Sequence, residues 1–197
     1  MRFEELEQDR KLANDRLAEA VAESEVISSE TARVRLIHKK INITMAARDA
    51  EWEKAQWWTQ NNEALHAWAA SGGKLPKLGM LETSETELRI LKIALDQVAT
   101  KLLVLSAREH MSLAEQLEYQ SRLKHLDSIQ AHLDAREALK SVGQVIGEGA
   151  IVNVENGAAE LLQREADALL KNSIGERSRA EELVANLPKA KGAPNGR

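Results

Sequence analysis

The spacing of Glu63 and His66 is the first feature of this sequence that metal chemistry could use. Three residues apart on a helix, a carboxylate and an imidazole point to the same side, as in the Glu-x-x-His pairs of di-iron helical bundles. Such a site needs this pair twice, together with two further glutamates, and no second Glu-x-x-His occurs in the sequence. We therefore expect both side chains to be solvated on a charged helix.

Histidine and serine side chains offer two further patterns, a metal pair and a hydrolase set. His125 and His132 are seven residues apart on one helical face and would bind a metal only with ligands from another helix. His110 lies near Ser106 and Ser112, but the sequence lacks the Gly-x-Ser-x-Gly turn that exposes a nucleophilic serine. Cysteine is absent as well. We predict no catalytic residue, no metal site and no cofactor, and we do not expect an enzyme.

A cluster of four cations could contact phosphate groups: Arg33, Arg35, Lys39 and Lys40. The alternative is that they form the solvated side of a helix and pair with Glu25 and Glu30, one or two turns earlier. We favour this second interpretation, because the chain has a net charge of −4 and nucleic-acid binding is typical of basic domains. Contact with nucleic acid through this cluster stays open as the less favoured alternative.

Long helices must position these side chains, because glycine and proline are absent from residues 1–71 and 80–142. These residues cost about 1 and 3 kcal/mol in a helix interior. We predict helices over about 2–71 and 84–142, joined by a turn at 72–83, with Ser84 and Glu87 forming a capping box. A short connection favours antiparallel neighbours. The predicted fold is therefore all-α: an elongated, coiled-coil-like antiparallel hairpin over residues 1–147, followed by a shorter C-terminal helical segment.

Apolar residues recur at helical spacing in both predicted helices. One row of the first helix is apolar at every seventh position: Leu6, Ala13, Ala20, Ile27, Val34 and Ile41. The neighbouring row is mixed: Arg10, Leu17, Ser24, Thr31, His38, Met45 and Trp52. The second helix has apolar residues on several sides over 88–105: Leu88, Leu91, Leu95, Val98, Leu102 and Leu105, with Ile90 and Ile93 on other faces. We expect this segment to be the best packed, and covered by the third helix or by another copy of the chain.

The C-terminal third of the sequence differs in character. Glycine and β-branched residues predict that the helix ends before a connector at 148–156, with one short strand or an extended segment over 151–154. Short helices are expected over 157–187, broken near Gly175, where Ser173 and Glu176 resemble a second capping box. Residues 188–197 are expected to be a flexible basic tail. Its cations are Lys189, Lys191 and Arg197.

Four tryptophans lie within 17 residues next to the predicted turn: Trp52, Trp57, Trp58 and Trp68. Tryptophan is favoured at binding hot spots, so this end of the hairpin is a candidate docking site. The equal alternative is that the four rings form the core of the closed end. With the six apolar residues of 88–105 named above, they are the predicted partner-binding residues.

Composition limits the remaining possibilities. Charged residues make up 29% and aromatic residues only 3%, a profile typical of long helices and coiled coils. No signal peptide is apparent, and no apolar run is long enough to span a membrane. We expect a protein that is cytoplasmic or packaged in a virion, and not secreted through a signal peptide.

These features together favour a non-enzymatic structural or assembly protein. It would associate with itself through long helices and with other proteins of a larger complex. The setting that we favour is a phage particle, as a scaffold, internal core, ejection or tail-associated protein. One alternative is a cytoplasmic adaptor or export chaperone of a bacterial secretion or motility apparatus. A second is a helical protein that binds metal or nucleic acid.

Overall fold

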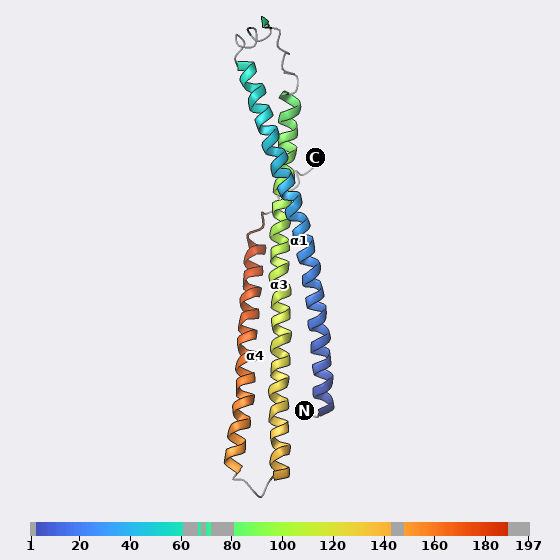
Figure 1. Ribbon diagram of the computed structural model, residues 1–197, viewed down its shortest axis with the longest axis vertical. Helices are drawn as coiled ribbons and strands as arrows, with labels where there is room; N and C mark the ends of the chain where they lie inside the picture. Colours follow the sequence, from blue (N-terminus) through green and yellow to red (C-terminus); the bar gives the residue numbers. More distant parts are fainter. Residues whose placement is uncertain (1–2, 61–66, 68–69, 72–80, 143–147, 189–197) are drawn as a thin grey trace, which may run out of the picture. The chain divides into compact units, whose positions relative to one another are not determined.

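The computed structural model describes residues 3–60, 67, 70–71, 81–142 and 148–188 of the chain. Its three long helices are α1 (Phe3–Gln60, 58 residues), α3 (Leu81–Val142, 62 residues) and α4 (Glu148–Ala185, 38 residues). Two long helices that pack against each other and a shorter third one confirm the all-α prediction (Figure 1). Among these described helices, none has a stretch long and apolar enough to cross a membrane.

The start of α3 differs from the prediction. The helix begins at Leu81, before Ser84, so Ser84 is not the N-terminal cap. The Glu87 carboxylate accepts a bond of 3.0 Å from Arg48 Nε on α1. The predicted capping box was wrong because Ser84 lies inside α3, where a residue cannot serve as its N-terminal cap.

The C-terminal region also differs from the prediction. Residues 148–156, expected to be a connector or a short strand, belong to α4, which passes Gly157 and Gly175 without a break. Ser173 and Glu176 lie inside this helix and form no cap. The local penalties are small, about 1 kcal/mol for a glycine and less for β-branched residues. The packing of α4 against α3 outweighs these penalties.

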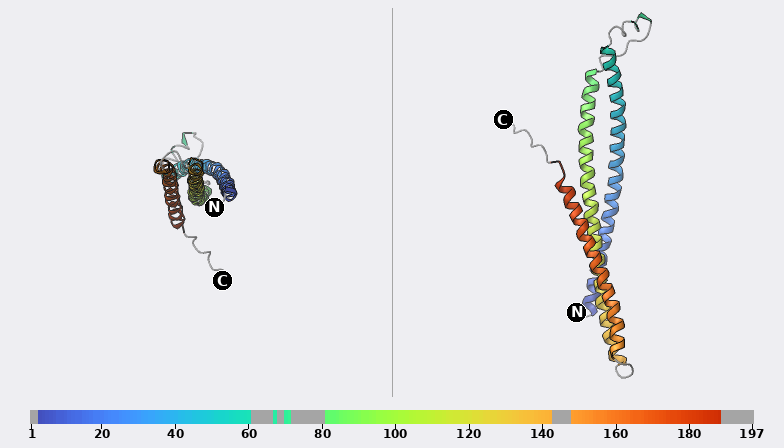
Figure 2. Two further views of the ribbon diagram at one scale, coloured as in Figure 1. Left: turned by 90° about the horizontal axis from the view of Figure 1, so that it is seen from below. Right: turned by 90° about the vertical axis from the view of Figure 1, so that its left-hand side faces the viewer.

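The chain divides into two compact units, each of which contains parts of two long helices. Unit 1 holds residues 1–29 and 104–187, and unit 2 holds residues 30–103 and 188–197. In unit 1, α3 lies between α1 and α4 (Figures 1 and 2). Hydrogen bonds join α3 to both neighbours: Ser112 to Ala20 of α1, and Ser121 to Ala166 of α4. The described part of unit 2 is the pair formed by the second half of α1 and the first part of α3.

The seam between α1 and α3 in unit 1 uses the apolar row of the prediction. Leu6, Ala13, Ala20 and Ile27 are all buried. The Ser112 hydroxyl donates to the Ala20 carbonyl oxygen at 3.1 Å. In an antiparallel pair, this bond fixes the register, and steps of seven residues place Leu6 opposite Leu126 and Ile27 opposite Leu105. Leu105 and Leu126 are buried as well, so the first four residues of the predicted apolar row lie in the seam.

The seam between α3 and α4 consists of small residues, which we call the small-residue ladder. The Ser121 and Ser128 hydroxyls donate to the carbonyl oxygens of Ala166 and Ala159 at 2.7 and 2.9 Å. The same antiparallel register continues in steps of seven. The facing pairs are Ala107–Ala180, Ala114–Ser173, Ser121–Ala166 and Ser128–Ala159, all between 0 and 8% exposed. Small side chains let the two backbones approach closely, and this continuous packing holds α4 helical past its glycines.

Ion pairs flank the ladder on the surface of unit 1. Lys124 of α3 pairs with Glu165 of α4 at 2.8 Å, and Arg177 of α4 pairs with Glu118 of α3. The hydrogen bond and the charge of Glu165 raise the pKa of Lys124. These pairs follow the register of the ladder, but exposed pairs contribute little stability.

Unit 2 is packed more loosely than the sequence predicted. Val34 and Thr31 of α1 are buried, and the Thr31 hydroxyl has no hydrogen-bond partner. Within 88–105, only Leu105, which belongs to unit 1, is buried. The expectation that this segment is the best packed was therefore wrong. A pair of helices buries one side of each, whereas α3 in unit 1 is buried on two sides.

Candidate functional site

The predicted partner-binding residues of α3 lie along its seam with α1. Leu88, Leu91, Leu95, Val98 and Leu102 are half-buried, and Leu105 is buried. The register within each unit places Val98 opposite Val34, and Leu105 opposite Ile27. These six side chains therefore pack within the chain, and any further contact with a partner stays a prediction.

The large apolar side chains that unit 2 exposes are different ones. Ile90 and Ile93 of α3 are 58 and 52% exposed, and Leu36 and Ile43 of α1 are 62 and 61% exposed. Each pair lies on the side of its helix that points away from the seam. The prediction noted that Ile90 and Ile93 occupy other faces but did not choose them as site residues. Their positions along the helix could have identified them. Ile90 lies one residue before Leu91 of the seam row and Ile93 two residues after it, so both point to another side of α3.

The tryptophan cluster is described only in part. Trp52 is half-buried in α1, in the mixed row that faces α3. The side chains of Trp57 and Trp58, and Trp68 as a whole, lie outside the described residues. The same is true of Glu63 and His66, and of the tail cations Lys189, Lys191 and Arg197. Their predicted roles stay predictions.

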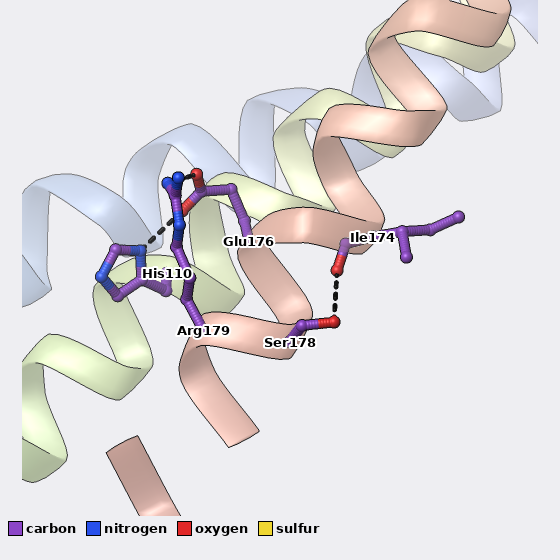
Figure 3. Close-up of polar contacts among 5 residues, drawn as sticks. All are labelled: His110, Ile174, Glu176, Ser178 and Arg179. Carbon is purple, nitrogen blue, oxygen red and sulfur yellow. Dashed lines mark hydrogen bonds and ion pairs between the residues drawn. The ribbon is translucent and has the colours of Figure 1, made fainter. Parts of the chain in front are cut away.

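The most enclosed polar cluster of unit 1 joins α3 to α4 (Figure 3). The Glu176 side chain is only 13% exposed and accepts bonds from His110 Nδ1 of α3 at 2.6 Å and from Arg179 at 2.5 Å. Ser178 and Ile174 lie on another side of α4, where the Ser178 hydroxyl donates to the Ile174 carbonyl oxygen at 3.1 Å. The cluster therefore offers no activated hydroxyl beside the imidazole, and its evident effect is to bind α4 to α3.

The serine named beside His110 in the sequence is also occupied. Ser112 is buried, and its hydroxyl is bound to the Ala20 carbonyl oxygen. A nucleophile needs a base within hydrogen-bond reach and an accessible oxygen. The Ser112 oxygen is not accessible to a substrate, so Ser112 does not form a hydrolase site with His110.

Two other histidines, His38 and His125, lie beside side-chain amides. His38 Nδ1 lies 3.2 Å from Asn42 Nδ2, and His125 Nδ1 lies 2.6 Å from Gln163 Oε1. His132 lines a shallow pocket of about 400 Å³ together with Ile129, Leu133 and Arg136. In the described part of the chain, no group of three or more histidine, aspartate or glutamate side chains could hold a metal ion.

The basic cluster is fully on the surface of unit 2. Arg33, Arg35, Lys39 and Lys40 are exposed. The expected partner Glu30 is bound to Lys101 of α3 at 2.8 Å. Among the described residues, none of the four cations takes part in an ion pair.

Comparison with known proteins finds no matching family model, no similar curated protein and no similar solved structure.

Proposed function

We propose that this protein is a non-enzymatic helical assembly protein that associates with further copies of itself within a larger complex. The observation that carries the proposal is the pair of exposed isoleucines of unit 2, Ile90 and Ile93, 58 and 52% exposed. Scattered exposed apolar residues are ordinary, but several on one face of a helix mark an interaction surface. These two lie three residues apart, on neighbouring turns of one face of α3.

The heptad phase of Ile93 supports the same conclusion. Ile93 is fourteen residues before Ala107, in the row of α3 that carries the small-residue ladder. In unit 1 this row is buried against α4, whereas Ile93 in the same row of unit 2 is exposed. Between Ala107 and Ile93 the row carries the half-buried Thr100, and beyond it the larger apolar side chain of Ile93 is exposed. A helix of another copy would bury it at a gain of about 25 cal/mol for each Å² of apolar surface.

The polar side chains of unit 1 support a structural role. The three buried serines of α3 donate to backbone carbonyl groups across helix seams: Ser112, Ser121 and Ser128. His110 and Glu176 bind α4 to α3. These side chains stabilise helix packing. A phage particle or a bacterial apparatus as the setting stays a prediction.

The test measures mass in solution by light scattering and sedimentation velocity, for the full chain and for a variant with Ile90→Ser and Ile93→Ser. We expect the unchanged chain to form dimers or larger species, and the variant to shift toward the monomer with unchanged helicity. The matched control is Leu161→Ser with Val184→Ser, which removes exposed apolar surface from α4. A chain that stays monomeric at the highest concentration would contradict the proposal.

A further inference from the structure

The side of α1 that points away from α3 carries opposite charges in the two units. In unit 1, residues 4–26 form what we call the acidic face. Its carboxylates are Glu4, Glu5, Glu7, Asp15, Glu19 and Glu25, all exposed. Two exposed cations, Lys11 and Arg16, accompany them, and the Arg16 guanidinium pairs with the Glu19 carboxylate at 2.9 Å. Leu12 and Val26, 49 and 64% exposed, lie among them. The face thus combines negative charge with exposed apolar side chains.

In unit 2, the same side of α1 carries what we call the basic face. It consists of Arg33, Arg35, Lys39 and Lys40 with the exposed Leu36 and Ile43 between them. Residues 31–47 contain no aspartate or glutamate at all, in a chain with 31 acidic residues. None of the four cations is used in an ion pair within the described chain. The basic face is therefore complementary to the acidic face in both charge and apolar content.

We infer that the acidic face of one copy binds the basic face of a second copy. Both faces belong to one continuous helix, α1. Members of each face recur at steps of three, four and seven residues, as in helices that pair along a seam. The inference rests on the self-association proposed above and names a second surface, on α1, that contributes to it.

A second copy fits the basic face better than nucleic acid does. Phosphate groups would use the four cations, but Leu36 and Ile43 in their midst would stay exposed to water. The net charge of −4 also opposes the approach of a polyanion. The acidic face supplies both carboxylates and apolar side chains. Because the two faces differ, the contact either closes reciprocally between two copies or continues along a row of copies.

The test reverses the charges of one face at a time in the full chain. The basic-face variant carries Arg33→Glu, Lys39→Glu and Lys40→Glu. The acidic-face variant carries Glu7→Lys, Asp15→Lys and Glu25→Lys. We expect each variant alone to associate at least about 100-fold more weakly than the unchanged chain at about 50 mM salt, because like charges then face each other. An equal mixture should recover a one-to-one pair, since each variant keeps one native face.

Two comparisons make the test specific. A chain with all six reversals has complementary faces again and should associate with itself. The matched control carries Lys92→Glu, Arg136→Glu and Lys171→Glu, which change the net charge as much as the basic-face variant does but lie on neither face. Circular dichroism checks that all variants keep their helices.

Each outcome separates this inference from the proposed function. If the unchanged chain does not associate, the proposed function fails. If it associates and the basic-face variant associates equally well, the function stands and the charge pairing is overturned. If the mixture does not recover a pair, the pairing is also overturned. Loss of binding to a duplex DNA probe by the basic-face variant, with self-association unchanged, would assign that face to nucleic acid and overturn the inference.

Discussion

Replacing Ala114 with leucine tests the small-residue ladder directly. Ala114 is 0% exposed and faces Ser173, which is 1% exposed, so the seam has no space for a larger side chain. Leucine adds three carbon atoms there and must push α4 away from α3. Overpacking of this kind costs about 1–3 kcal/mol. At about 2–4 °C per kcal/mol for a chain of this size, we expect the melting temperature to fall by roughly 2–12 °C.

The control for this prediction is Ala168→Leu on the exposed side of α4. Alanine and leucine have similar helix propensities, so this change should shift the free energy of unfolding by no more than about 0.5 kcal/mol. Urea unfolding followed by circular dichroism measures both variants. An Ala114→Leu chain as stable as the control would refute the close approach of α3 and α4 at this layer.

The register of the ladder has its own check, made simple by the absence of native cysteine. Cysteines introduced together at Ala114 and Ser173 face each other and should form a disulfide on mild oxidation. Cysteines at Ala114 and Asn172 form the control pair, because Asn172 is exposed and points elsewhere. Faster cross-linking of the control pair would show that the ladder is out of register by one residue.

Three other predictions follow from single sites. Gly175→Ala should stabilise the chain by about 0.5–1 kcal/mol in urea unfolding, because an added Cβ meets nothing within 4 Å and alanine restricts the unfolded chain; a loss of stability would show that the glycine is needed. Glu176→Ala should cost about 1–3 kcal/mol, since it removes a partly buried carboxylate and leaves His110 without its partner; an unchanged urea midpoint would remove this cluster from the packing argument. Trp57→Ala with Trp58→Ala should weaken self-association, measured by sedimentation, more than thermal stability, and a large fall in melting temperature without a change in mass would make these residues core only.

The α1 seam could be predicted from the sequence, whereas the α4 seam could not. Leu6, Ile27 and Val34 stand out every seven residues because large apolar side chains carry a strong periodic signal. The ladder is built from alanine and serine, which contribute little to such a signal. Its seven-residue repeat, from Ala159 to Ala180, is nevertheless regular. The ladder residues are buried because the backbones of α3 and α4 approach closely. The density of apolar residues in the sequence does not reveal such an approach.

The same reasoning explains why the sequence overestimated the burial of α3 over residues 88–105. The density of leucine and isoleucine over 88–105 suggested burial on all sides, but local composition does not say how many helices are present to cover it. In unit 2 the pair of helices leaves Ile90 and Ile93 exposed. The basic cluster was treated as a solvated face for a similar reason. Nearby glutamates in sequence suggested pairing, yet Glu30 pairs with Lys101 across the seam.

The change of side-chain size along one row of α3 separates two kinds of contact. The row carries small residues from Ala107 to Ser128, where α4 approaches closely, and a large one at Ile93. A helix that covers Ile93 must lie further out and accept its side chain between four residues of its own. The geometry that suits α4 therefore does not suit a partner at Ile93. For this reason we assign the ladder to folding within the chain, and the exposed isoleucines remain the residues that we propose for association between chains.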